Sequence, residues 1–408
     1  MGDWAEKKLS DVCNITIGGT PARANAEYWD NDFRTENYWV SIKDMNQKVI
    51  NTTAERITQK GINNSNAKLV KSGTVLISFK LSIGKVSIAG EDLYTNEAIA
   101  ALETTDIDDK FLFHGLQKWN LLQDVDQAVK GATLNKEKLK KIRIEIPESR
   151  KEQSTIATIL TTIDQAIEKT EQLIAKYERI KTGLMQDLLT CGIDKEGNIR
   201  SEETHEFKDS PLGRIPREWE VGTVGKDCII QNSFRKPLSA ELRENMKGKY
   251  PYFGPTGILD YINEYRVDGK YVLIGEDGDH FLKFISQEMT LLIEGKFNVN
   301  NHAHILEGKG DCTTEWIHCF FCHRDITYHL TRQGAGRFKL NKAALSKLPI
   351  AIPKSGEQLR IIEKVDGIRN YLQGEKEILK NYRSLKAGLM QDLLTGEVRV
   401  DNLISIFV

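Results

Sequence analysis

Residues 183–190 read GLMQDLLT, and the same eight letters return at residues 388–395. A second pair of matching segments precedes the two copies: LNK at 134–136 comes before IRIEIP at 142–147, and LNK at 340–342 comes before LPIAIP at 348–353. The period of about 205 residues is far longer than the 20–50 residues of a solenoid repeat. One whole module is therefore duplicated, and the duplication predicts two related surfaces with approximate two-fold symmetry.

Each copy ends in a segment that is predicted to be one long helix. The first, residues 152–190, has no proline and a single glycine near its end, and its stripe recurs every seven residues at Ile156, Ile163, Thr170, Tyr177 and Leu184. A helix of about 37 residues spans roughly 55 Å, longer than ordinary globular helices of about 8–20 residues. We expect it to pair with its own copy, at about residues 357–395, as an antiparallel coiled coil rather than to be buried separately in a globular core.

The predicted fold class is α+β, with two mixed α/β globular domains that are each followed by a long helix. The expected boundaries are 1–150 for the first globular domain, 151–190 for its helix and 191–216 for a polar linker. The second globular domain then covers 217–355, its helix 356–396, and a short tail 397–408.

Composition narrows the class of protein. The chain has 408 residues, of which 40% are hydrophobic and 28% charged, as in soluble globular proteins. No signal peptide and no transmembrane segment are expected, and six scattered cysteines are typical of reduced thiols in the cytoplasm. The net charge of −1 argues mildly against a nucleic-acid binder, so a DNA site has to rest on local clusters of positive charge.

Three segments raise the question of a metal site, and for each a structural explanation is favoured. The turn GEDG at 275–278 is typical of a solvated loop, and HCFFCH at 318–323 has no second CxxC and looks like a packed apolar helix. In HAH at 302–304 a polar strand edge is favoured over a metal pair. No phosphate-binding glycine loop and no hydrolase motif is present, so we predict no catalytic and no metal-binding residue.

Positive residues cluster at the same place in both copies, just before the Ile-Pro strand. Such residues beside glycine-rich turns, GAT at 131–133 and GAG at 334–336, suit phosphate contacts, although a solvated charge run is an alternative for any single lysine. Other polar loops carry side chains of the kinds that contact bases in the major groove. The predicted DNA-binding residues are Thr20, Arg23, Lys43, Lys80, Lys85, Lys136, Arg235, Lys236, Thr256, Lys296, Asn301, His302, Arg332, Arg337 and Lys339.

These motifs, in their order along the chain, resemble the specificity subunit of type I restriction-modification systems. The resemblance covers essentially the whole chain, and its duplicated arrangement is more specific than any single motif. Besides the GLMQDLL repeat, it rests on GGTP at 18–21, WVSIKDM at 39–45, NEAIAA at 96–101, DSPLGRIP at 209–216, YFG at 252–254, GEDG at 275–278 and NNHAH at 300–304.

The resemblance implies two target-recognition domains, each reading one half of a split double-stranded DNA sequence. The helices would set the spacing of the half-sites, with 55 Å corresponding to about 16 base pairs, and would dock two methyltransferase subunits, which restriction subunits then join. The subunit itself would not be catalytic; S-adenosylmethionine, ATP and magnesium would belong to its partners. On the helices we expect partner contacts at Tyr177, Met185, Gln186, Tyr382, Met390 and Gln391.

Two other classes of function are weighed against this one. An independent nuclease or methyltransferase would need a carboxylate–lysine metal cluster or an Asn/Asp-Pro-Pro-Tyr/Phe segment, and the sequence has neither. The other class is a coiled-coil scaffold that binds only proteins. Mutating the two basic clusters separates the two interpretations, because loss of DNA binding with intact partner binding supports DNA recognition.

Overall fold

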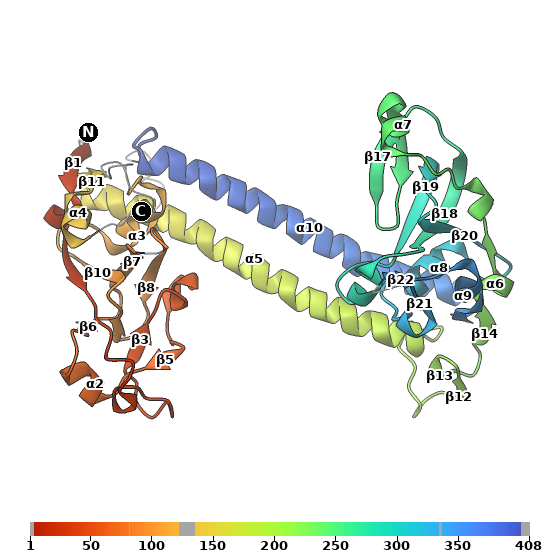
Figure 1. Cartoon of the computed structure of the whole chain (residues 1–408), viewed down its shortest axis with the longest axis horizontal. Helices are drawn as coiled ribbons and strands as arrows, with labels where there is room; N and C mark the ends of the chain where they lie inside the picture. The colour runs from red at the N-terminus through yellow and green to blue at the C-terminus, as the bar shows by residue number, and fades with distance from the viewer. Residues whose placement is uncertain (1–3, 81, 122–134, 334–336, 401–408) are drawn as a thin grey trace. The chain divides into compact units, whose positions relative to one another are not determined.

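The computed structural model describes residues 4–80, 82–121, 135–333 and 337–400, which form two compact units. Unit 1 comprises Met1–Gln172 and Glu377–Val408, and unit 2 comprises Leu173–Lys376. Figure 1 labels the helices and strands of both units. No helix among the described residues is long and apolar enough to cross a membrane.

The two long helices predicted from the apolar stripe are confirmed as α5 (Arg150–Thr190) and α10 (Ser355–Leu394). Within unit 1, Asp164 of α5 pairs with Lys386 of α10, with oxygen and nitrogen 2.7 Å apart. Within unit 2, Glu178 of α5 pairs with Lys376 of α10 at 2.6 Å. In unit 1 a second pair joins Glu171 to Arg383 at 2.7 Å, so the partner number falls as the α5 number rises and the two helices run antiparallel there, as the sequence predicted.

A buried carboxylate near the start of each long helix forms an ion pair with an arginine in the segment that follows the other long helix. In unit 1, Arg399 donates two hydrogen bonds of 2.8 Å to Glu152, whose side chain is fully buried. In unit 2, Arg200 pairs in the same bidentate manner with Glu357. The chain turns back toward these carboxylates after Gly396 (φ +73°) and Gly192 (φ +64°), where the left-handed backbone favours glycine.

The globular part of unit 1 is built on two mixed sheets. Its strands are β1 (Trp4–Lys8), β2 (Cys13–Ile17), β3 (Tyr38–Val40), β4 (Val49–Ile50), β5 (Glu55–Arg56), β6 (Leu69–Val70), β7 (Val75–Ser78), β8 (Val86–Ala89), β9 (Leu93–Thr95), β10 (Ile99–Thr104) and β11 (Arg143–Pro147). The strand orders are β2-β10-β7-β8-β4 and β5-β3-β9-β6, and β1 pairs with β11. The short helices are α1 (Leu9–Val12), α2 (Gln59–Asn63), α3 (Asp109–Lys118) and α4 (Lys136–Lys141). Val75 and Ile77 of the fully buried β7 belong to the same hydrophobic core cluster as Phe111, Leu112 and Leu116 of α3.

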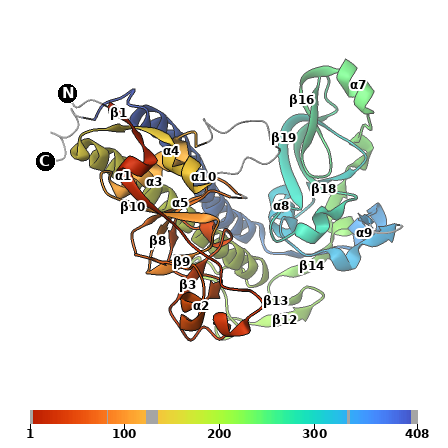
Figure 2. The ribbon, with the colours of Figure 1, turned by 60° about the vertical axis from the view of Figure 1, so that its left-hand side comes forward.

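The globular part of unit 2 is built on one larger mixed sheet of order β15-β20-β18-β19-β16-β17. Its strands are β15 (Cys228–Ile230), β16 (Lys247–Phe253), β17 (Ile258–Ile262), β18 (Val267–Gly275), β19 (Thr290–Val299) and β20 (Ala303–Gly308). Three two-stranded ladders pair β12 (Phe207–Ser210) with β13 (Gly213–Pro216), β14 (Glu220–Thr223) with β23 (Pro349–Ile352), and β21 (Thr331–Gln333) with β22 (Arg337–Lys339). The helices are α6 (Val224–Asp227), α7 (Ala240–Asn245), α8 (Thr314–Phe321) and α9 (Lys342–Lys347). Helix α8 packs on β18, β19 and β20 (Figure 2).

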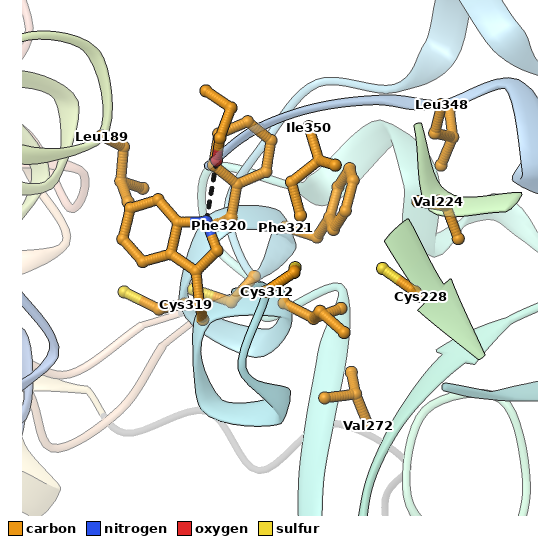
Figure 3. Packing of buried hydrophobic residues seen from close by; sticks show 14 of the residues in the cluster. Leu189, Val224, Cys228, Val272, Cys312, Cys319, Phe320, Phe321, Leu348 and Ile350 are labelled. Atoms are coloured by element: carbon orange, nitrogen blue, oxygen red, sulfur yellow. Dashed lines mark hydrogen bonds between the residues drawn. The ribbon is translucent and has the colours of Figure 1, made fainter. Parts of the chain in front are cut away.

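The core of unit 2 explains the segment HCFFCH at 318–323. Figure 3 shows Cys319, Phe320 and Phe321 of α8 among other buried side chains, and all three are at most 1% exposed. The indole Nε1 of Trp316 donates to the carbonyl oxygen of Ala351 at 2.8 Å, which satisfies the polar atom of this large ring. The packed apolar helix favoured from the sequence is what the structure contains.

The two globular parts repeat not only their elements but also individual hydrogen bonds. In unit 1, Gln153 of α5 donates to the carbonyl of Pro147 and accepts from the amide of Asp108, both at 2.8 Å. In unit 2, Gln358 of α10 donates to the carbonyl of Pro353 at 2.7 Å and accepts from the amide of Thr313 at 3.2 Å. The buried glutamine therefore ties the helix to the Ile-Pro strand in the same way in each unit.

Candidate nucleic-acid interface

In unit 1, the loops that carry several predicted DNA-binding residues meet at one edge of the second sheet. Strands β3 and β9 pair in parallel with Val40 opposite Thr95, so their carboxyl ends lie side by side. Lys43 follows the first of these strands and Glu97 follows the second. The amide of Gly19 donates to the carbonyl of Thr95 at 2.8 Å, which brings the segment after β2 to the same edge. We refer to this place as edge 1.

Edge 1 gathers further predicted residues through short contacts. The hydroxyl of Thr20 donates to the carboxylate of Glu97. Lys80 follows Phe79, whose amide donates to the carbonyl of Ala98 at 3.0 Å. The ammonium group of Lys85 donates to Asn46 at 2.6 Å, in the loop that follows Lys43. Bonds of these residues or of their neighbours in the chain therefore bring Thr20, Lys43, Lys80 and Lys85 to edge 1, although they are scattered over more than 60 positions.

Arg23 is held rigidly beside edge 1. Its guanidinium carbon lies 3.8 Å from the ring centroid of Trp29 and 4.8 Å from that of Trp39, and both its terminal nitrogens contact Glu55. The indole Nε1 of Trp39 donates to the carbonyl of Gly19 at 3.0 Å. The Arg23 side chain is still 53% exposed, so a stacked and ion-paired guanidinium is presented to solvent in one orientation.

Unit 2 builds a corresponding edge from the corresponding strands. Strands β16 and β19 pair in parallel with Phe253 opposite Val299. The amide of Lys236 donates to the carbonyl of Val299 at 2.8 Å, as Gly19 does to Thr95 in unit 1. Thr256 follows the first strand, and Asn301 follows the second. We call this place edge 2.

A carboxylate organises the cations of edge 2. Glu276 accepts from Arg235 at 2.6 Å and lies 3.6 Å from the ammonium group of Lys339. The same arginine donates to the carbonyl of Asn301 at 3.0 Å, and Asp277 contacts Nδ1 of His302 at 2.8 Å. The turn at 275–278 thus binds the cationic side chains of its own chain, which is an alternative to the metal site considered for it.

The two histidines of residues 302–304 have separate surroundings. His302 is exposed beside Asp277, whereas His304 is fully buried, with one ring nitrogen 2.7 Å from the carbonyl oxygen of Leu340 and the other 2.8 Å from the amide nitrogen of Asn232. Burial lowers the pKa of His304 below its ordinary value, although the Leu340 carbonyl opposes this shift. Both nitrogens of His304 therefore have partners within the protein, but β20 lies between β15 and β18 inside the sheet, so the polar strand edge favoured from the sequence is wrong for His304.

Of the remaining predicted DNA-binding residues, Arg332 is linked to edge 2 through Phe338, whose carbonyl accepts from the amide of Gly278 at 3.2 Å, whereas Lys136 and Lys296 are not linked to an edge by described contacts. Lys296 lies on β19, with its ammonium group 4.6 Å from the ring centroid of Tyr265, and Arg332 is exposed over Phe338. Lys136 is the first residue of α4. The glycine-rich segments 131–133 and 334–336 and the side chain of Arg337 lie outside the described residues.

The predicted partner contacts on the helices divide into exposed and packed residues. In unit 2, Gln186 is exposed, but Met185 is only 4% exposed and belongs to the core, while Tyr177 lies against Tyr371 with ring centroids 4.6 Å apart. Met185, which was expected to contact a partner, therefore lies in the core of unit 2 instead. In unit 1, Met390 is half-buried against the core, and Gln391 donates to Glu397 at 3.3 Å.

Each unit has a groove beside the helix residues predicted to contact partners. In unit 1, Tyr382, Leu385 and Leu389 of α10 line a groove of about 680 Å³ together with the first turns of α5. In unit 2, Gln186 borders a groove of about 400 Å³ that is also lined by Phe284 and Ile285. Ile285 is 71% exposed, an unusual exposure for a large aliphatic side chain that marks the groove as a candidate contact surface.

The zinc alternative for residues 318–323 does not match the surroundings of the individual side chains. His318 faces Thr290, with Nδ1 3.0 Å from the hydroxyl oxygen. The group of potential ligands found among the described residues is Glu288, Cys322 and His323. The guanidinium group of Arg369 lies 2.8 Å from the sulfur of Cys322 and 3.3 Å from Glu288, so this group already has a cationic partner.

The comparisons with known proteins agree with this architecture. The family described as "Type I restriction modification DNA specificity domain" matches residues 1–179 and 216–381. The chain is 24% identical to the type I restriction enzyme MjaIX specificity subunit of Methanocaldococcus jannaschii, over 98% of this chain and 95% of that protein. It is 22% identical to the EcoprrI specificity subunit of Escherichia coli, over 89% of this chain and 87% of that protein.

A solved structure shares the fold over nearly the whole chain. The crystal structure of a type I restriction-modification S subunit from M. genitalium matches with a TM-score of 0.62 at 15% identity, covering 96% of each chain. Because the family match covers most of this chain, the protein belongs to the type I restriction-modification DNA specificity family. The resemblance seen in the motifs is confirmed.

Several residues of the two edges were not predicted as site residues from the sequence. Glu97 was noted only within the motif NEAIAA, and Glu276 was weighed only as a possible metal ligand in the turn GEDG. Trp29 and Trp39 were not predicted as site residues. Their spacing from Arg23 in the chain does not indicate that its guanidinium lies over both indole rings, because loops join the three residues.

Proposed function

We propose that this chain is the DNA-recognition subunit of a type I restriction-modification complex and that it recognises a split double-stranded target. Edge 1 and edge 2 read one half-site each, within recognition domains at residues 1–150 and 217–355. The observation that carries this proposal is the construction of the same cationic edge twice, on corresponding parallel strand pairs with different exposed side chains. Two copies of one scaffold with different surface residues suit two different half-sites.

Within this proposal the chain recognises DNA and docks the other subunits, and those partner subunits carry the catalytic sites. Relatives that match over nearly their whole length are named specificity subunits. The grooves beside Tyr382 and Gln186 are the proposed docking places for two methyltransferase subunits, to which restriction subunits bind. The long helices α5 and α10 set the distance between the half-sites.

Edge 1 can attract DNA although the whole chain has a net charge of −1. Lys43, Lys80, Lys85 and Arg23 are at this edge with two carboxylates, Glu55 and Glu97, so its cations outnumber the carboxylates named there. Phosphate contacts by such residues supply affinity that does not depend on sequence and that falls as salt rises. Specificity then has to come from other side chains at the same edge.

The test is methylation by the complex as it exists in the cell. The chain is co-expressed with its methyltransferase partner, and methylated positions are mapped on genomic DNA by single-molecule sequencing. A split motif with methylation in both halves, lost when this chain is deleted, is the expected result. A continuous motif, or methylation that does not depend on this chain, would favour a scaffold that binds only proteins.

A variant of edge 1 tests the site separately. Lys80→Ala is expected to weaken binding to all duplexes alike and to reduce the slope of log affinity against log salt by about 1. Lys118→Ala, at the exposed end of α3 in the same unit, is the matched control. If the two variants bind duplex DNA equally well at matched salt, Lys80 is not a phosphate contact.

A further inference from the structure

The turns that lie at the two edges are the same turn in hydrogen-bonding terms. The side-chain oxygen of Asn96 accepts from the amide of Ala98 at 3.0 Å, and that of Asn300 accepts from the amide of His302 at 2.9 Å. Each turn joins two neighbouring strands of its unit, β9 to β10 and β19 to β20. By its letters alone, TNEA at 95–98 lines up with NNHA at 300–303, which would match Glu97 with His302. The hydrogen bonds instead match Asn96 with Asn300, a difference of one position.

Backbone bonds around the two turns support the corrected alignment. Each turn is bonded to the end of the strand that pairs in parallel with the strand before it, β3 or β16, and to the residue that follows a central strand, β7 or β18. The amides and carbonyls that form these bonds are equivalent in the two units. The bonds are Asn96 to Val40 (3.1 Å), Asn300 to Phe253 (3.0 Å), Phe79 to Ala98 (3.0 Å) and Glu276 to His302 (2.7 Å). Glu97 in unit 1 therefore corresponds to Asn301 in unit 2.

Glu97 and Asn301 are the middle residues of these equivalent turns, and both side chains are exposed. The neighbouring asparagine is the same in both units, because its side chain builds the turn. The middle residue does not take part in that bond, so it is free to differ. The two equivalent turns thus present different groups: a carboxylate at edge 1 and a carboxamide at edge 2.

The carboxylate of Glu97 lies among groups that keep it ionised. The hydroxyl of Thr20 donates to it, and the positive charges of Lys80 and Arg23 act in the same direction, so the pKa of Glu97 is lowered although partial burial opposes this shift. Arg23 has its own carboxylate partner in Glu55, so Glu97 is not needed to neutralise it. Within the described residues, Thr20 provides the one side-chain hydrogen bond that Glu97 accepts.

A charged carboxylate at a DNA-binding edge is repelled by phosphates and cannot donate to them. Its oxygens can accept hydrogen bonds, and base edges in the major groove offer such donors at N4 of cytosine and N6 of adenine. A carboxylate oxygen here therefore opposes general DNA binding and gains an interaction only where the correct base is present.

The carboxamide of Asn301 offers a different pattern. Its backbone carbonyl accepts from Arg235 at 3.0 Å, which fixes the turn, while no side-chain bond of Asn301 is found in the described part of the chain. An amide carries a donor and an acceptor side by side. This pair matches N7 and N6 of adenine in the major groove, where asparagine binds in a bidentate manner.

We propose that Glu97 and Asn301 are the base-reading residues of the two turns: Glu97 accepts a hydrogen bond from N4 of a cytosine in one half-site, and Asn301 pairs with the N7 and N6 of an adenine in the other. The proposal rests on the proposed function and specifies it further. Thr20, Lys80, Arg23 and Arg235 then position the turns and the phosphates around them.

The experiment uses the complex with its methyltransferase partner and duplexes carrying the split motif found by methylation sequencing. Each position of both half-sites is varied in turn, and affinity is measured at one salt concentration. Glu97→Gln is expected to reduce discrimination at one cytosine position of a single half-site by about 10- to 100-fold, because the amide can also donate. Asn301→Ala is expected to do the same at one adenine position of the other half-site.

A substitution that exchanges the chemistry makes the test more demanding. Glu97→Asn places the unit 2 side chain on the unit 1 turn, and preference at the affected position is expected to move from cytosine toward adenine. Glu91→Gln, an exposed carboxylate of the same unit, is the control and should leave every position unchanged. Thermal unfolding of each variant shows whether the unit is still folded.

The outcomes separate this inference from the proposed function. If the wild-type complex has no split motif, the proposed function fails. If a split motif exists but Glu97→Gln and Asn301→Ala weaken all sequences equally, or change nothing, then these residues only support the turns and the inference is wrong. Loss of discrimination at a single position in each half-site supports it, since a structural role would not select one base pair.

Discussion

Removing the guanidinium group of Arg200 should destabilise unit 2 strongly, because it leaves a carboxylate buried. The side chains of Arg200 and Glu357 are both 7% exposed, and breaking such a buried pair by removing one partner typically costs about 3–5 kcal/mol. The carboxylate of Glu357 would keep two donors, the amide of Ile193 at 3.1 Å and the indole of Trp219 at 3.2 Å. We therefore expect Arg200→Met to lower the free energy of unfolding by about 3 kcal/mol, at the lower end of this range.

The measurement is thermal and denaturant unfolding followed by tryptophan fluorescence, since Trp219 contacts Glu357 directly. For a unit of this size, about 3 kcal/mol corresponds to a fall in Tm of roughly 6–12 °C. Arg217→Met is the matched control, because the Arg217–Glu206 pair is exposed, with 70% and 75% of the two side chains accessible. An exposed pair contributes about 0–1 kcal/mol.

A double variant distinguishes charge burial from lost packing. Glu357→Gln in the Arg200→Met background removes the buried charge but keeps an oxygen that can accept from Trp219 and Ile193, so it should recover about 2 kcal/mol. Were Arg200→Met to cost no more than Arg217→Met, or the second substitution to restore nothing, the reasoning from a buried unpaired carboxylate would be refuted.

Three further predictions concern the helices, a histidine and the cysteines. Inserting four residues, about one turn, into either α5 or α10 should change the permitted gap between half-sites in methylation mapping, and an unchanged gap would contradict their role in spacing. Burial lowers the pKa of the fully buried His114 to about 4. Because the unfolded chain then binds more protons than the folded chain, the free energy of unfolding should fall by up to about 3 kcal/mol as the pH drops from about 6.5 to 4. In an acid titration, His114→Gln should flatten this dependence on pH. Burial also raises the pKa of Cys319 and Cys322 to about 12, so both thiols should be alkylated far more slowly at pH 8 than Cys191 when peptides are analysed by mass spectrometry.

The long helices and the duplication could be predicted because both are local or periodic properties. The apolar stripe from Ile156 to Leu184 repeats at a helical spacing that needs no knowledge of the rest of the fold. The packing of residues 318–323 was also predictable, since an apolar run with no second pair of ligands favours a buried helix rather than a zinc site. These conclusions depend on residue types and spacings along one segment.

The assembly of the edges was not predictable in the same way. Arg235, Glu276 and Lys339 lie far apart in the sequence, and parallel pairing of β16 with β19 and the ladders beside them bring their side chains within about 4 Å. The matching of Glu97 with His302 by sequence is off by one residue, because the letters of the two turns align in more than one way and only the hydrogen bonds reveal the register. Met185 was expected at a partner contact, yet its side chain is buried in the core of unit 2, because the globular part packs on that face of α5.

By itself, the sequence determined that one module occurs twice, that each copy ends in a helix too long to remain unpartnered, and that the chain resembles DNA specificity subunits. Only the tertiary structure decided which polar residues share an edge, which cations are neutralised by Glu276 or Glu55, and which turn residue faces solvent in each unit. The physical reason is that helices arise from bonds between residues three or four apart, whereas an edge depends on strand register across the whole module.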